Sequence, residues 1–159
     1  MPSKFGGKNQ LTCWKFLPDV LFSISLTTYV KLRYDLLDTE STNEIREGCL
    51  EAFTGIMNCI KSASKNNIEC VNEFQPYLHV IFKLIEDILK DDYRTDTSLK
   101  VSIGLIGDMC NGFGNVVYPY MQNESILDVL RKSKTSADKE LKSVAVWASK
   151  EARKLKAVY

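Results

Sequence analysis

A glycine-rich segment, SIGLIGDMCNGFG at residues 102–114, is the part of the sequence that looks most like a phosphate-binding loop. A nucleotide-binding P-loop needs GxxxxGK followed by Ser or Thr, because the lysine and the hydroxyl reach phosphate and magnesium. Here Asp108 follows Gly107 and Phe113 follows Gly112, so neither group is in place. The dinucleotide pattern GxGxxG also fails after Gly114. The segment is therefore predicted to be a packing helix, with Gly107 allowing a neighbouring helix to approach closely.

The candidate nucleophiles and metal ligands do not form a recognisable catalytic pattern. The cysteine count is odd and no CxxC pair occurs, which predicts free, buried thiols in a reducing compartment. His79 is the only histidine, and we expect it to be partly buried and structural. An enzyme using Cys49, Cys59 or Cys110 as its nucleophile remains an alternative, although no paired base accompanies them. Cys13 and Cys70, the remaining two of the five cysteines, have no such partner either. The sequence therefore predicts no enzyme activity, no cofactor and no metal site.

The charges are unevenly distributed, although the net charge is only +1. An acidic middle is followed by a basic C-terminal segment that includes SKEARKLKAVY, a pattern that favours recognition of a partner over nucleic-acid binding. The apolar run at residues 16–30 is too short and too polar to span a bilayer. A signal-peptide interpretation is disfavoured by Pro18 and Asp19 within that run. We expect neither a nucleic-acid nor a membrane partner.

Six helices are expected to position the polar residues. Three are strongly amphipathic, at residues 41–63, 96–113 and 136–156, because their apolar side chains recur every three or four residues. Three further candidates lie at about 15–34, 71–91 and 117–133, the last mainly within 123–133. A strand stays open for the first candidate, since SISLTTYV is rich in β-branched residues. The expected core stripes are Ile45, Cys49, Ala52, Ile56 and Ile60; Leu99, Ile103, Ile106, Cys110 and Phe113; and Leu141, Ala145, Ala148, Ala152 and Leu155.

These helices pair into about three helical hairpins, at 15–64, 70–113 and 116–157. A repeat of about 40–50 residues is typical of HEAT units, which bury their apolar faces only by stacking. The sequence thus predicts an all-α, armadillo-like HEAT-repeat α-solenoid over residues 15–159. Residues 1–14 are expected to be an unrelated or disordered start. A closed six-helix bundle remains the alternative.

The sides of the amphipathic helices that face away from the apolar stripes carry the candidate binding residues. A large aromatic side chain displaced from the core beside carboxylates could stack on a cation. One exposed ion pair contributes only about 0–1 kcal/mol, so tight binding would need many contacts and a long basic ligand, such as a Lys/Arg-rich helix. The candidates are Glu44, Glu47, Glu51 and Asn58 on the first amphipathic helix, Asp108 and Asn111 on the second, and Trp147 and Glu151 on the third.

With these helices defined, the sequence resembles the C-terminal end of the importin-β (karyopherin-β) family. The resemblance is carried by NEIREGCLEAFTGIMNCIK (43–61), LIGDMCNGFG (105–114), RKSKTSADK (131–139) and VAVWASKEARKLK (144–156), in this order. It implies the last HEAT repeats of a superhelix, with the three amphipathic helices on the concave side. It also implies a nuclear import receptor located in the cytoplasm and nucleus, including the nuclear pore.

The resemblance also implies a partner and a binding mode. In that family the acidic concave surface grips the basic N-terminal helix of importin-α, or another basic cargo segment. Glu44, Glu47 and Glu51 match the family's acidic positions, Asp108 its Gly-Asp pair and Trp147 its final tryptophan. By this resemblance we expect the family's regions that bind Ran and the main nucleoporin sites to be absent from this chain. A truncated structural or regulatory helical fragment without independent transport activity is the alternative.

Overall fold

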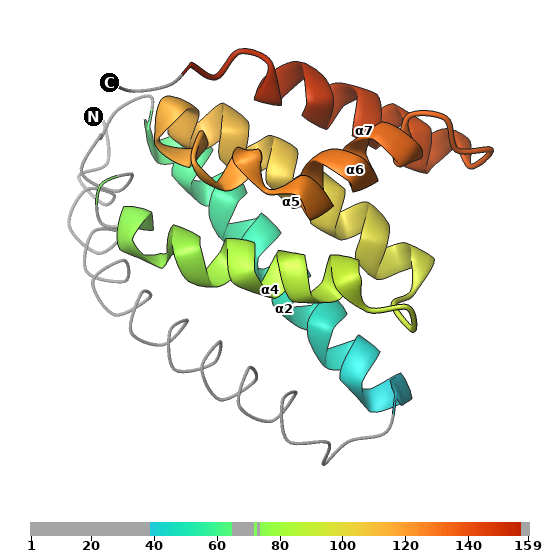
Figure 1. Ribbon diagram of the computed structural model, residues 1–159. Helices are drawn as coiled ribbons and strands as arrows, with labels where there is room; N and C mark the ends of the chain where they lie inside the picture. The colour runs from blue at the N-terminus through green and yellow to red at the C-terminus, as the bar shows by residue number, and fades with distance from the viewer. Residues whose placement is uncertain (1–38, 65–71, 73, 157–159) are drawn as a thin grey trace, which may run out of the picture.

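The computed structural model describes residues 39–64, 72 and 74–156, and within them the chain is helical with no strand (Figure 1). The expected all-α fold class is confirmed. The expectations for residues 1–14 and for a helix or strand at 15–34 lie outside the described residues, and the repeat boundaries stay predictions. The α-helices are α2 (Thr39–Ser64), α4 (Leu78–Lys90), α5 (Asp96–Phe113), α6 (Glu124–Ser133) and α7 (Lys139–Ala152), and the short 3₁₀ helices are η1 (Gln75–Tyr77), η2 (Gly114–Val117) and η3 (Tyr120–Gln122).

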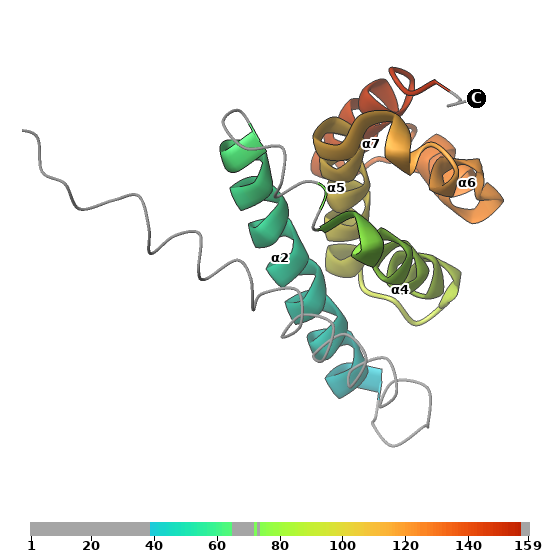
Figure 2. The same ribbon diagram turned by 90° about the vertical axis from the view of Figure 1, so that its left-hand side faces the viewer.

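The helices form two layers. Helices α2, α5 and α7 lie side by side in one layer with α5 in the middle, and α4 and α6 form the other layer (Figure 2). Buried side chains fill the space between the layers, and α5 contributes to the core along almost its entire length. The position of α5 explains its composition, because a helix that packs on several sides needs small or apolar residues in most positions.

The three helices of the first layer run parallel. For each pair of neighbouring helices, the residues that contact each other are separated by a nearly constant number of residues along the chain. Between α2 and α5, Thr95 donates to Glu47 and Lys61 donates to Asp108, pairs separated by 48 and 47 residues. Between α5 and α7, the Lys100–Glu140 and Asn111–Glu151 pairs are both separated by 40 residues. Parallel neighbours at a fixed shift are the geometry of stacked repeats, whereas neighbours in an up-and-down bundle alternate in direction.

The ends of the helices follow local signals in the sequence. Helix α5 has the predicted bounds, because the Thr95 side chain accepts from the Ser98 N–H at its start and Gly114, at φ +57°, ends it. Asn123 caps α6, and its side chain accepts from the Ser125 N–H. The expected last helix, 136–156, is too long at both ends, since α7 begins three residues later and ends four residues earlier. Asp138 is its N-cap and accepts from the N–H groups of Glu140 and Leu141.

The buried faces of α5 and α7 agree well with the predicted stripes, but the stripe of α2 is displaced. Leu50, Phe53 and Met57 are buried on α2, together with the predicted Ile56 and Ile60. Ala52 is exposed, and the predicted Ile45 and Cys49 are only half-buried. Helix α2 carries two adjacent apolar lines, and its contact with α5 buries the line that contains the larger side chains.

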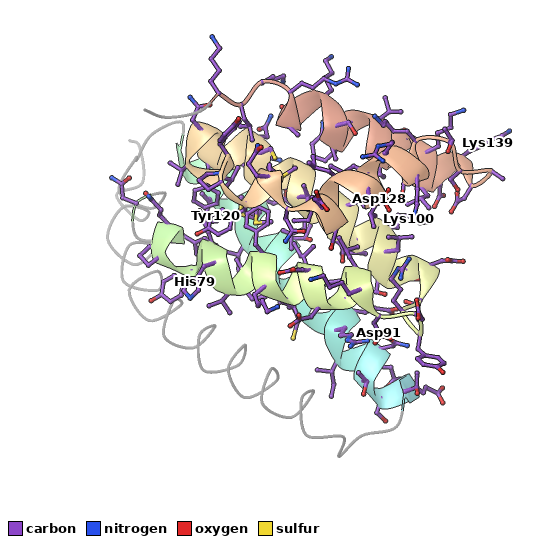
Figure 3. The ribbon with its side chains drawn as sticks, in the orientation of Figure 1. His79, Asp91, Lys100, Tyr120, Asp128 and Lys139 are labelled. Carbon is purple, nitrogen blue, oxygen red and sulfur yellow. The ribbon has the colours of Figure 1, made fainter. Side chains whose placement is uncertain are left out.

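One ring contact joins η3 to α4, and one ion pair joins α2 to the segment after α4. The ring of Tyr120 in η3, which Figure 3 labels, stacks on Phe82 of α4, with centroids 4.6 Å apart and planes within 2°. Arg46 of α2 donates to Asp91, after the end of α4, at 2.5 Å. Burial raises the pKa of the Asp91 carboxyl, but hydrogen bonds from the Tyr93 backbone N–H and from Arg46 outweigh it and hold the pKa below its usual value.

Candidate ligand-binding face

The predicted site residues all belong to the three parallel helices, and we call the surface that they define the α2–α5–α7 face. Their exposure differs, however. Glu44, Glu51, Asn58, Asn111 and Trp147 are exposed, Glu47 and Asp108 are half-buried, and Glu151 is buried.

Trp147 lies at the surface and its position depends on a glycine of the adjacent helix. The side chain is 36% exposed, as expected for an aromatic residue displaced from the core. A Cβ atom at residue 107 would lie only 2.8 Å from Cε3 and Cη2 of the indole. Gly107 therefore provides the close approach predicted for it, and the six-membered ring of Trp147 fills the space. Gly48 of α2 plays no such part, because no described atom lies within 4 Å of a Cβ placed there.

Asp108 lies next to the indole and pairs with a lysine from α2. Lys61 Nζ donates to Asp108 Oδ1 at 2.5 Å, and the same Nζ lies 5.9 Å from the centroid of the Trp147 ring. Lysine over an indole face gains a cation–π attraction in addition to the ion pair. A carboxylate of α5 and an aromatic ring of α7 thus form a cation-binding position that Lys61 occupies.

Glu151 is turned inward, so the expectation that all eight residues lie on an exposed polar face is wrong for this residue. It is 5% exposed, accepts from Asn111 Nδ2 at 3.0 Å, and pairs with Lys154 at 2.6 Å. The hydrogen bonds from Lys154 and then Asn111 lower the pKa of Glu151 despite its burial. Glu151 orients Asn111 and ties α7 to α5.

The acidic residues of α2 differ in their partners. The Glu47 carboxylate accepts from the Thr95 hydroxyl, which links the N-terminal half of α2 to the start of α5. Among the described residues, Glu44 and Glu51 form no ion pair and are exposed. These two carboxylates are therefore open to a cationic ligand.

Among the described side chains the candidate catalytic groups do not converge, and the side chain of Cys59 lies outside the described part. His79 is exposed, so the expectation of partial burial is wrong, and its Nδ1 lies 2.7 Å from the Pro76 carbonyl oxygen. Burial, followed by the charge of Glu151, raises the pKa of the Cys110 thiol to about 12. The described residues contain no cluster of three or more His, Cys, Asp or Glu side chains placed to hold a metal ion. None of the helices described here is both long and apolar enough to cross a membrane.

Lys61 also belongs to this face, although it is not among the residues predicted from the sequence. A signal was present, since Lys61 lies three residues after Asn58 and ten after Glu51, on the same side of α2. Its partners could not be found from the sequence, because they come from two helices that are distant along the chain.

Two layers of helices, with successive helices of one layer parallel at a fixed sequence shift, define an α-solenoid. A family profile described as "Importin subunit beta-1-like, TPR repeats" matches residues 17–134. The chain belongs to this importin beta-1-like family, and the resemblance found in the sequence is confirmed. TPR and HEAT units are both two-helix repeats that stack in this way.

Individual relatives agree with this assignment. Over 111 residues the chain is 29% identical to importin subunit beta-1 of Arabidopsis thaliana, and over 112 residues it is 24% identical to that of Schizosaccharomyces pombe. Each match covers 69% of this chain and 12% of the relative, so the chain spans about an eighth of these proteins. A crystal structure of importin beta in an ammonium sulfate condition matches with a TM-score of 0.76 and 23% identity, covering 96% of this chain and 17% of that one.

Proposed function

We propose that this chain is a non-enzymatic binding module of the nuclear import receptor class, acting in the cytoplasm and nucleus. Its α2–α5–α7 face would form an acidic concave wall that holds the basic N-terminal helix of importin-α, or a cargo segment of similar charge. Family membership supports the receptor class. The geometry of Trp147 and Asp108 supports the binding mode.

The observation that carries the proposal is an exposed indole fixed beside a carboxylate. Gly107 leaves room for the Trp147 ring at the α5–α7 contact, and Asp108 is the next residue along α5. A ligand guanidinium could stack on the ring while donating to the carboxylate, and a buried or partly buried arrangement of this kind contributes about 2 kcal/mol. Glu44 and Glu51 extend the negative surface along α2, so a long ligand could make several such contacts.

A titration of a fluorescent basic importin-α N-terminal peptide tests the proposal. Trp147→Ala should weaken binding about tenfold, and raising the salt concentration should weaken binding to the wild-type chain, because exposed ion pairs are screened. Leu127→Ala is the matched control, since Leu127 is also an exposed apolar residue but lies on α6. Its affinity should equal that of the wild type.

Two results would contradict the proposal. Salt-insensitive binding that Trp147→Ala leaves unchanged would place the ligand elsewhere on the chain. Absence of binding by the folded wild-type chain would favour the alternative, a structural or regulatory fragment without independent transport activity.

A further inference from the structure

We propose that Lys61 is an internal substitute for a ligand cation, so that a basic ligand must displace it from Asp108 and Trp147 in order to bind. This inference rests on the proposed function, because it concerns how the same face recognises its ligand. Under this inference Lys61 opposes binding, and the face prefers arginine over lysine in the ligand.

The geometry places one ammonium group where three helices meet. Lys61 projects from the last turn of α2, Asp108 from α5 and Trp147 from α7. The Nζ atom is 2.5 Å from Asp108 Oδ1 and 5.9 Å from the indole centroid. These two partners, a carboxylate and an aromatic ring, are the pair that the proposed binding mode assigns to a cation of the ligand.

The burial of the pair allows an exchange. The Lys61 side chain is 28% exposed and that of Asp108 is 14% exposed, so the ammonium group lies near water while the carboxylate is largely shielded. Lysine has a flexible four-carbon stem, and its ammonium group is strongly hydrated. Lys61 can therefore swing into solvent without a change in the backbone. Asp108, held on the central helix, cannot follow it and needs a new cation.

The chemistry of the site favours a guanidinium as the replacement. An arginine can donate two parallel hydrogen bonds to a carboxylate and can stack its planar group on an indole, whereas an ammonium acts as a point charge. An arginine of the ligand therefore gains more at Asp108 and Trp147 than Lys61 loses. A ligand lysine would only exchange one ammonium for another. The site consequently discriminates between the two basic residues.

The test compares three variants of the full chain with the same peptide titration. Lys61→Met keeps the apolar stem and removes the competing cation, and Lys61→Arg keeps the cation. Lys100→Met is the matched control, because Lys100 also joins two helices through an ion pair, to Glu140 at 2.5 Å, and its removal changes the net charge equally. The probes are two helical peptides of the same length, one with arginine and one with lysine at all basic positions.

Lys61→Met should bind the arginine peptide about 3- to 30-fold more tightly than Lys100→Met does, a range set by the strength of a cation–π contact with partial desolvation. Lys61→Arg should show no gain. In the Trp147→Ala background the difference between Lys61→Met and Lys100→Met should largely disappear, since coupled residues give non-additive effects. The wild-type chain should prefer the arginine peptide, and Lys61→Met should keep this preference while it binds both peptides more tightly.

Several results would overturn the inference. Equal gains in Lys61→Met and Lys100→Met would show a general charge effect and leave the proposed function intact. Weaker binding by folded Lys61→Met would show that Lys61 supports the site instead of competing for it. No binding by any variant would remove the inference and the proposed function together. Circular dichroism and thermal unfolding check folding, and Lys61→Gln replaces Lys61→Met if the latter unfolds, with a smaller gain expected.

Discussion

The Trp147 indole fills the space above Gly107, where a Cβ atom would lie 2.8 Å from Cε3 and Cη2 of the ring. The most exposed aromatic surface of the candidate site thus depends on the absence of a side chain on the neighbouring helix. A glycine inside a helix costs about 1 kcal/mol relative to alanine. At this position the cost is offset by the contact between α5 and α7.

Gly107→Ala should displace the indole and weaken binding of the basic peptide. Overpacking typically costs about 1–3 kcal/mol, and the gain in helix propensity recovers up to about 1 kcal/mol. The net loss of unfolding free energy should therefore be about 0–2 kcal/mol, measured by urea denaturation. The wavelength of the Trp147 fluorescence maximum should also change. It is recorded in a Trp14→Phe background, which leaves a single tryptophan.

Gly104→Ala is the control for this prediction. A Cβ atom there would lie 3.7 Å from Cγ1 of Val144, which is ordinary van der Waals contact. This variant should be as stable as the wild type or more stable, by up to about 1 kcal/mol, with unchanged emission and affinity. Identical emission and affinity in both alanine variants would show that the ring does not depend on Gly107.

Glu151→Gln should destabilise the protein at neutral pH by about 1–2 kcal/mol, because the carboxylate holds Asn111 and Lys154 through charge-assisted hydrogen bonds. The pKa of Glu151 is lowered in the folded state. Its stabilising effect is therefore fully present above the unfolded-state pKa of about 4.3, and it is lost as the pH falls through the lower folded-state value. Urea denaturation of the wild type and of Glu151→Gln, at pH 7 and at pH 3, measures the difference in unfolding free energy between them.

The control for this pH dependence is Glu140→Gln. Glu140 also pairs with a lysine, but its side chain is 77% exposed, so its replacement should change the unfolding free energy by less than about 0.5 kcal/mol at either pH. A Glu151→Gln effect that stays constant between pH 7 and pH 3 would show that the carboxylate charge is not what stabilises the helix pair.

Cys110 should resist alkylation in the folded protein. Burial and the nearby charge of Glu151 raise its pKa to about 12, so almost no thiolate forms at pH 8. Peptide mass spectrometry after iodoacetamide treatment should find Cys110 unmodified in the native chain and fully modified in guanidinium, with half-buried Cys49 reacting faster in the native state. Alkylation of native Cys110 at the rate of the unfolded chain would restore it as a candidate nucleophile.

Much of the fold could be predicted because it depends on local signals. The bounds of α5 follow from Thr95 at one end and Gly114 at the other, and the broad apolar face of α4 is evident from spacing alone. Asp138, a good helix-capping residue, was present in the sequence, but the hydroxyls of Thr135 and Ser136 competed with it as caps. The choice between them depends on how the preceding turn folds.

The displaced stripe of α2 has a different cause. Its apolar residues form two adjacent lines, and a helical wheel cannot show which of them meets a neighbouring helix. Only the packing against α5 shows that Phe53 and Met57 are buried while Ala52 is exposed. Tertiary contacts of this kind are absent from the spacing of a single helix.

For the candidate site too, features that depend on one helix could be predicted, and features that depend on contacts between helices could not. The exposure of Trp147 could be derived from its angle to the apolar stripe of its own helix. The burial of Glu151 and the pairing of Asp108 with Lys61 could not, because the partners come from other helices. The sequence thus places charges on a face, and the packing decides which of them are already neutralised.

The parallel course of α2, α5 and α7 also has an electrostatic consequence for the backbone. The peptide dipoles of an antiparallel pair oppose each other, whereas those of three aligned helices add. Each helix contributes about half a negative charge at its C-terminal end, and these ends gather at one edge of the layer. Lys61 and Lys150, in the last turns of α2 and α7, lie at that edge. A potential difference therefore runs along the helix axes, so a chain with unequal charge at its two ends has a preferred direction when it lies along them.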